Sequence, residues 1–280
     1  MLFRSDKVEY RLAKFGFRGR PSMDHAVQMA ARVREHLGIG GDEPIRDICG
    51  LLEAQGIKVG PVPTASQGFF GLSVAPSDGG PAIVVNTWDR ISVERWIFTA
   101  AHEFGHLVLH LADYDVRQTD ETEEHEKQAN AFAAAFLMPG TAFRKEWDET
   151  YGLTLVERVL KVKRIFRVSY RTVLHRLAES GSVQGNIWAR FQSDFQRRHG
   201  RVLLRNHEPE ALAKDTFRAN FPENLAAAEP EHLSPVDFPG DRLSRLVRRA
   251  IEGEEISLGR GAEILGRSLQ DMRNLSASWV

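Results

Sequence analysis

The chain has 280 residues, a formal net charge of -1, 42% hydrophobic and 27% charged residues, and a single cysteine. This composition is that of a folded globular protein and excludes collagenous and intrinsically disordered chains. One cysteine excludes a disulfide framework and a zinc site built from cysteines alone. No run approaches the roughly 18 consecutive apolar residues that span a bilayer, and the first seven residues contain no apolar signal core. We therefore expect a cytoplasmic protein without a membrane partner.

Short-range patterns predict two helices and a β-hairpin in the first 90 residues. Apolar residues at spacings of three and four predict helices over residues 21–38 and 44–56. The period then changes to that of two short strands, which flank a turn-forming run rich in Pro, Asp and Gly. The strands are expected at residues 69–74 and 82–86.

The rest of the chain is predicted to be mostly helical. Ser92 is a good N-cap for a long helix that runs from Val93 to about Leu111. The later segments are an acidic loop at 113–124, helices at 125–137 and 153–177, a weakly patterned cover or linker at 206–241, and a helical tail at 243–275.

The strongest signal is the pentapeptide from His102 to His106, His-Glu-Phe-Gly-His. Histidines at i and i+4 lie on one face of a helix, about 6 Å apart along its axis, so both rings can bind one Zn²⁺. The glutamate beside the first histidine is then placed to take a proton from a metal-bound water. We therefore expect Glu103 to be the general base of a hydrolytic zinc site.

The third metal ligand is left open by the spacing. A catalytic zinc usually has three protein ligands and one open position. His110 lies about 12 Å along the axis from His102, so it is interpreted as a residue that packs or supports a ligand. His125 and Glu126 both precede the apolar stripe of the next helix, and periodicity does not choose between them. The carboxylates of the acidic loop are interpreted mostly as solvated charges.

Two segments resemble, in order and spacing, the motifs of the ImmA/IrrE family of zinc metallopeptidases. They are FTAAHEFGHLVLH at residues 98–110 and EKQANAFAAAFLMP at residues 126–139. The strand at 83–86 and Arg95 also fit that family's pattern, and the resemblance covers roughly residues 25–180. It implies Zn²⁺ as the cofactor, Glu126 instead of His125 as the third ligand, and Asn130, one turn further on, as a residue that supports a ligand.

The resemblance also implies a fold, a reaction and partners. The expected fold is α+β, with a mainly helical zincin-like peptidase domain, a small β-sheet, helix-turn-helix-like helices and a mostly helical C-terminal region. Family members typically cleave a helix-turn-helix transcriptional repressor and so release genes of a stress, mobile-element or defence programme. The same substrate class is expected here, with single-stranded DNA as a candidate activator.

Four segments are expected along the chain, and charge is divided unequally among them. Residues 113–126 contain seven acidic residues against one arginine, whereas residues 153–205 contain twelve basic residues against three acidic ones. The near-neutral net charge of the chain therefore arises because an acidic segment and a basic segment cancel. The expected segments are 1–20, a basic arm or linker; 21–152, the zinc metallopeptidase domain; 153–185, a basic helix-turn-helix-like closing segment; and 186–280, a C-terminal region with a helical tail.

The basic closing segment has two interpretations. Residues 155–179 are predicted to form two helices around a short turn, with Ser169 as N-cap of the second. Such a pair could place its second helix on nucleic acid, or it could close the peptidase domain with solvated arginines outside. The candidates for nucleic-acid contact are Lys161, Lys163, Arg164, Arg167, Arg171 and Arg176.

The remaining predictions concern aromatic residues, the tail and the alternative function. Trp188, Phe191 and Phe195 have helical spacing and are interpreted as core, with base stacking as the lesser alternative. Residues 256–272 are predicted to form two short helices around a turn. A role of these helices in docking or homodimerisation is favoured over sequence-specific recognition of DNA bases.

The alternative function is a non-proteolytic DNA- or repressor-binding regulator, or an antitoxin, with a structural metal site. A structural site does not need Glu103, which argues against that alternative. Candidates for the oxyanion stabiliser are Tyr114, His110 and Arg95.

Overall fold

The computed structural model describes residues 10, 12, 22–111, 122–150, 152–181, 185–204, 207–220, 229–239 and 242–277. The chain divides into two compact units, Met1–Phe238 and Pro239–Val280. The predicted arm at 1–20, except for Tyr10 and Leu12, and most of the predicted acidic loop lie outside the described residues. No helix in the described part of the chain is long and apolar enough to cross a membrane.

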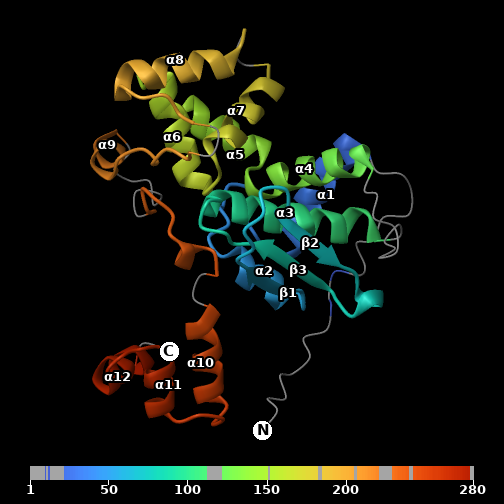
Figure 1. The fold of residues 1–280 in the computed structure, drawn as a ribbon, viewed down its shortest axis with the longest axis vertical. Coiled ribbons are helices and arrows are strands. Elements are labelled where there is room, and N and C mark those ends of the chain that lie inside the picture. The colour runs from blue at the N-terminus through green and yellow to red at the C-terminus, as the bar shows by residue number, and fades with distance from the viewer. Residues whose placement is uncertain are drawn as a thin grey trace. The chain divides into compact units, whose positions relative to one another are not determined.

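The first unit is mainly helical with one small sheet, which confirms the predicted α+β fold class (Figure 1). Its helices are α1 (Met23–His36), α2 (Ile48–Ala54), α3 (Val93–Leu109), α4 (Glu123–Leu137), α5 (Gly140–Asp148), α6 (Leu155–Phe166), α7 (Tyr170–Glu179), α8 (Ile187–His199) and α9 (Lys214–Asn220). Its strands are β1 (Lys58–Val62), β2 (Gly71–Val74) and β3 (Ala82–Asn86). Both predicted N-caps form: Ser92 and Ser169 accept hydrogen bonds from the N–H groups of Arg95 and Thr172.

The sheet has the order β1-β3-β2, with β1 parallel and β2 antiparallel to β3. The antiparallel pair is the predicted hairpin. The strand β1 was not predicted, because Gly60 and Pro61 weaken a strand pattern; the chain tolerates them there because β1 is an edge strand. The opposite edge is β2, which lies against α3 (Figure 1).

The helices α3 and α4 pack closely because Gly105 lacks a side chain. A Cβ atom at this position would lie 3.0 Å from the Phe132 ring of α4. That ring packs edge-on against Phe104, with centroids 5.5 Å apart, and stacks on Phe136. The buried guanidinium of Arg34 on α1 donates to the Phe136 carbonyl oxygen at 2.8 Å, so α1 holds the end of α4 in place.

The positive charges of α6 point into the protein. Lys161 is fully buried, and its ammonium group donates to the Glu146 carbonyl oxygen at 3.1 Å. Lys163 is ion-paired with Glu94 on α3 and, at 3.2 Å, with Glu208. Burial of such a charge is tolerated only with carboxylates or carbonyl groups around it.

The other predicted nucleic-acid candidates also have protein partners. Arg164 donates to the carbonyl oxygens of Leu212 and Glu229, and Arg167 pairs with the Glu229 carboxylate at 2.5 Å. Arg176 on α7 donates to the Met138 carbonyl oxygen at 2.8 Å, and Arg171 is half-buried. Lys161, Lys163 and Arg164 are therefore sequestered from phosphates, and α6 closes the domain from inside. DNA binding stays a prediction.

Residues beyond 186 continue the core of the first unit. Phe191 and Phe195 are buried, Trp188 packs partly buried against them, and Phe217 and Phe238 belong to the same apolar cluster as α3 and α4. These rings are therefore core residues, as the helical spacing indicates. The predicted boundaries at 20, 152 and 185 stay predictions. The structure adds a division between Phe238 and Pro239.

The second unit contains α10 (Arg242–Glu252), α11 (Leu258–Ile264) and α12 (Leu269–Ala277). The predicted pair of short helices is present as α11 and α12. The small core of this unit consists of Val247, Ala262 and Met272. Gly261 fits against α10, since a Cβ atom there would lie 2.6 Å from the Ile251 side chain.

The buried cluster around Lys163 predicts a pH dependence of stability. Burial, reinforced by the neighbouring Glu94 charge, raises the pKa of Glu208 from 4.5 to about 7, while Lys163 opposes the shift. The folded protein thus holds this proton more tightly than the unfolded chain. The contribution of Glu208 to the free energy of unfolding is most favourable below about pH 4.5 and is lost progressively as the pH rises to about 7.

We expect Glu208→Gln to flatten the fall in the free energy of unfolding over this range, measured by urea denaturation. Glu149→Gln, at an exposed site, is the control, and an unchanged slope in Glu208→Gln would contradict the prediction.

Candidate metal centre

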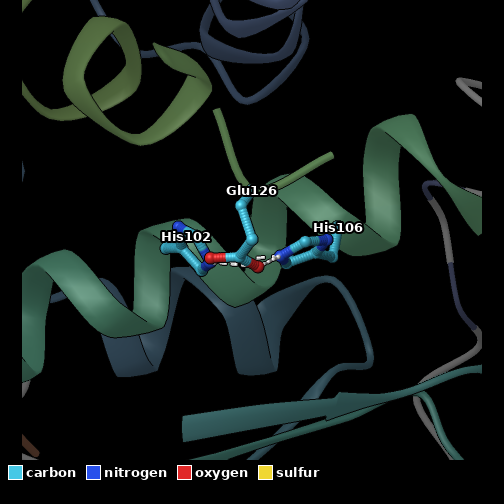
Figure 2. A group of neighbouring side chains, drawn as sticks. All are labelled: His102, His106 and Glu126. Atoms are coloured by element: carbon cyan, nitrogen blue, oxygen red, sulfur yellow. Dashed lines mark hydrogen bonds and ion pairs between the residues drawn. The ribbon is translucent and has the colours of Figure 1, made fainter. Parts of the chain in front are cut away.

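Three of the predicted metal ligands meet at one point. His102 and His106 project from the same face of α3, and Glu126 reaches them from the first turn of α4 (Figure 2). The two Nε2 atoms are 3.1 Å apart, and the Glu126 Oε1 atom lies 3.1 Å from that of His106 and 3.4 Å from that of His102. The three donor atoms form a nearly equilateral triangle.

This triangle has the size that zinc requires. Tetrahedral bonds of about 2.0–2.1 Å place neighbouring donor atoms about 3.3 Å apart, and the three observed separations are 3.1, 3.1 and 3.4 Å. Three donors leave the fourth position of a tetrahedron open. The site therefore has the ligand number and spacing of a catalytic zinc site and fits the metal that the sequence predicts.

The proton positions on His102 support the same conclusion. Its Nδ1 atom lies 3.1 Å from Oδ1 of Asn130 on α4. An amide oxygen only accepts hydrogen bonds, so Nδ1 must donate. In the neutral ring, Nε2 then carries the lone pair that faces the other two donor atoms. Asn130 thus has the supporting position that the family resemblance implies.

A chain of hydrogen bonds sets the tautomer of His106. The Gln128 amide nitrogen donates to Glu124, 3.2 Å away, which directs the amide oxygen toward His110 Nε2 at 2.9 Å. His110 must donate through Nε2, so its Nδ1 accepts from Nδ1 of His106 at 3.0 Å. The His106 proton is thereby committed to Nδ1. Two imidazole lone pairs and a carboxylate face one another, and a cation is the partner that satisfies all three.

Glu103 is held on the sheet side of α3. Its side chain is buried, and its Oε2 atom accepts a hydrogen bond from the Ser73 hydroxyl at 2.9 Å. Gly71 and Ser73 lie on the same face of β2, because alternate residues of a strand share a face. A Cβ atom at Gly71 would lie 2.8 Å from the Val84 carbonyl oxygen and 3.2 Å from Glu103 Oε1. The absence of a side chain at Gly71 lets β2 reach the glutamate.

Other predicted candidates lie near the centre without joining the triangle. His125 stacks on His110 with ring centroids 4.2 Å apart. His110 lies behind His106 and is buried, so it supports a ligand and does not face the open position. Arg95 lies two turns before His102 on α3. Tyr114 lies outside the described residues.

Gln128, Ser73 and Gly71 are contributors that the sequence did not single out. Gln128 is only 1% exposed, and a polar residue within the apolar stripe of α4 is a signal that could have indicated it. Ser73 and Gly71 gave no such signal, because their importance depends on β2 lying against α3.

The comparison with protein families finds one match in this chain. Residues 52–178 match the family model described as the IrrE N-terminal-like domain, Peptidase_M78. The match contains α3, α4 and the whole sheet. Among curated proteins, no sequence matches the chain.

The hydrogen-bond chain predicts an effect on metal affinity. We expect His110→Ala and Gln128→Ala to lower zinc affinity by about 10–100-fold, because the tautomer of His106 is no longer enforced. Competition with a chromogenic chelator measures this affinity directly. Gln196→Ala, at an exposed position of α8, should bind zinc as the parent does. Unchanged affinity in both folded variants would contradict the assigned chain.

The close approach at Gly71 predicts an effect of a single methyl group. Gly71→Ala should destabilise the protein by about 1–3 kcal/mol, because the new Cβ meets the β3 backbone, and should lower activity by displacing Glu103. Gly60→Ala in β1, whose Cβ would lie 4.0 Å from the nearest atom, is the control. Urea denaturation and zinc content report on both variants, and a Gly71→Ala protein as stable as the control would contradict the packing argument.

Proposed function

We propose that the protein is a zinc endopeptidase that cleaves a helix-turn-helix transcriptional repressor, on the basis that residues 52–178 match the IrrE N-terminal-like peptidase family. The observation that carries the proposal is the ligand triangle of His102, His106 and Glu126 beside a held glutamate, Glu103. The peptidase class follows from the family. The metal, the reaction and the substrate are the proposal.

The arrangement supports a catalytic role for the metal. A bound zinc ion would polarise the scissile carbonyl and lower the pKa of a water molecule. Glu103 would act as the general base, taking a proton from the attacking water and returning it to the amide nitrogen as the peptide bond breaks. The Ser73 hydroxyl fixes the orientation of the Glu103 carboxylate through the bond to Oε2. A purely structural site would leave Glu103 without a chemical role, which disfavours the alternative of a non-proteolytic regulator.

The edge strand β2 supports a polypeptide substrate. It pairs with β3 on one side, and the sheet order places no strand on its other side within the described residues. An extended peptide can add to such an edge through main-chain hydrogen bonds. Because Gly71 and Ser73 lie next to Glu103, a peptide paired with β2 would pass the metal centre.

The repressor is the most specific part of the proposal. It follows from the resemblance to the ImmA/IrrE family, whose members typically cleave helix-turn-helix repressors. The first substrate to assay is therefore a helix-turn-helix repressor encoded in a gene adjacent to that of this chain. Derepression of a stress, mobile-element or defence operon, in the cytoplasm and with single-stranded DNA as an activator, is the expected setting.

Replacement of the general base tests the proposal. We expect Glu103→Gln to retain one zinc ion and to lose cleavage of the neighbouring repressor by about 10²–10⁴-fold. Atomic emission measures the metal and gel electrophoresis measures cleavage, with and without a single-stranded oligonucleotide. Glu123→Gln, on the exposed start of α4, should cleave normally. Full activity of a zinc-loaded Glu103→Gln protein would exclude this mechanism.

A further inference from the structure

A cleft of about 960 Å³ opens beside the metal centre, within the first unit. Residues from the start of α3, from α4 and from α7 line it, together with the segments around Phe70 and Trp88. Asn130 belongs to this lining and also accepts the hydrogen bond from His102. The cleft therefore reaches the residue that supports a metal ligand.

The charges in the cleft are unbalanced. Its basic side chains are Arg90, Arg95, Lys127, Arg171 and Arg176. Its two carboxylates already have cationic partners: Glu179 lies 3.5 Å from Arg176, and Glu208 lies 3.2 Å from Lys163 and accepts from the Tyr170 N–H. Lys127 is paired with Glu123 at 2.6 Å, so the remaining positive charge on the walls comes from arginines.

Arg95 is the cation best placed to bind an anion. Its guanidinium lies over the Phe70 ring, 4.4 Å from the centroid, and 5.9 Å from that of Phe98. In the part of the chain that the structure describes, it makes no salt bridge. Partial burial lowers the pKa of Arg95, and the Glu126 carboxylate opposes that shift, so Arg95 is electrostatically coupled to a metal ligand. Aromatic rings hold its plane, and a guanidinium can bind a carboxylate through two parallel hydrogen bonds.

We propose that this cleft binds an acidic side chain of the polypeptide substrate, with Arg95 as the residue that selects it. The inference rests on the proposed peptidase function. Arg95 and His102 are seven residues apart on α3, about 10 Å along its axis, which an extended peptide covers in about three residues. The selected Asp or Glu is therefore expected about three residues from the scissile bond.

A peptide fits the cleft better than a nucleic acid does. The protein's own guanidinium groups lie over the aromatic rings, with Arg90 over Trp88 at 5.1 Å and Arg95 over Phe70, so neither face is fully available for base stacking. A single acidic side chain needs only one cation beside an apolar wall.

Selection of binding peptides distinguishes an acidic peptide from a nucleic acid as the ligand of the cleft, and it does not depend on cleavage. The zinc-loaded full chain carrying Glu103→Gln is used to select from a displayed library of random 12-residue peptides. We expect one position enriched in Asp or Glu, and about tenfold or greater loss of affinity when that residue becomes Asn or Gln. Adding Arg95→Gln should abolish the enrichment, and adding Arg95→Glu should replace it with Lys or Arg. Adding Arg190→Glu, on exposed α8, should leave it unchanged.

Several results would overturn the inference. The selection would overturn it by recovering no binding peptides, by enriching no acidic residue, or by giving the same acidic enrichment with Arg95→Glu. A competition experiment would overturn it if a 20-residue oligothymidine displaced the peptide in a manner that depends on Arg95. The last result would assign the cleft to nucleic acid. Equal zinc content and melting temperature of the variants show that folding is intact. Repressor cleavage by the parent protein is scored separately, so cleavage without acidic selection overturns only this inference, whereas absent cleavage overturns the proposed function.

Discussion

The candidate metal centre depends on how closely α4 approaches α3. His102 and His106 stand on one helix by their spacing, but the third donor, Glu126, arrives only because the two helices pack with Phe132 against Gly105. Arg34 fixes the far end of α4 through the Phe136 carbonyl oxygen. The separation of the three donor atoms is thus set by helix packing, and a rigid packed contact holds a ligand more accurately than a loop would.

The same packing arranges the groups behind the ligands. Asn130 and Gln128 lie on α4, and each controls a histidine of α3, Asn130 directly and Gln128 through His110. Two helices therefore supply both the metal donors and the hydrogen bonds that set their tautomers. On the opposite side of α3, β2 brings Ser73 to Glu103, so the proposed base and the candidate ligands are positioned by different neighbours.

Buried charge connects this site to the rest of the unit. Lys163 on α6 pairs with Glu94 in the first turn of α3, and Glu208 joins from a segment far along the chain. The excess of positive charge between residues 153 and 205 is thereby neutralised in part by carboxylates from elsewhere. Two basic residues of this range, Arg171 and Arg176, line the cleft together with Arg95, whose guanidinium lies over the Phe70 ring.

The sequence by itself determined the helix that carries His102, Glu103 and His106, the hairpin that follows the first two helices, and the resemblance to a peptidase family, because each depends on local periodicity or on a contiguous motif. It left Glu126 and His125 equal by spacing, and it could not place Ser73 or Gly71. It also described Lys161, Lys163 and Arg164 as candidates for nucleic-acid contact, since a charge pattern carries no information on partners distant in the chain. Only the tertiary structure shows where these side chains lie and which groups they contact. A ligand from a second helix, a strand beside a glutamate and an ion pair across 69 residues all depend on which elements pack together, and that is a property of the whole core.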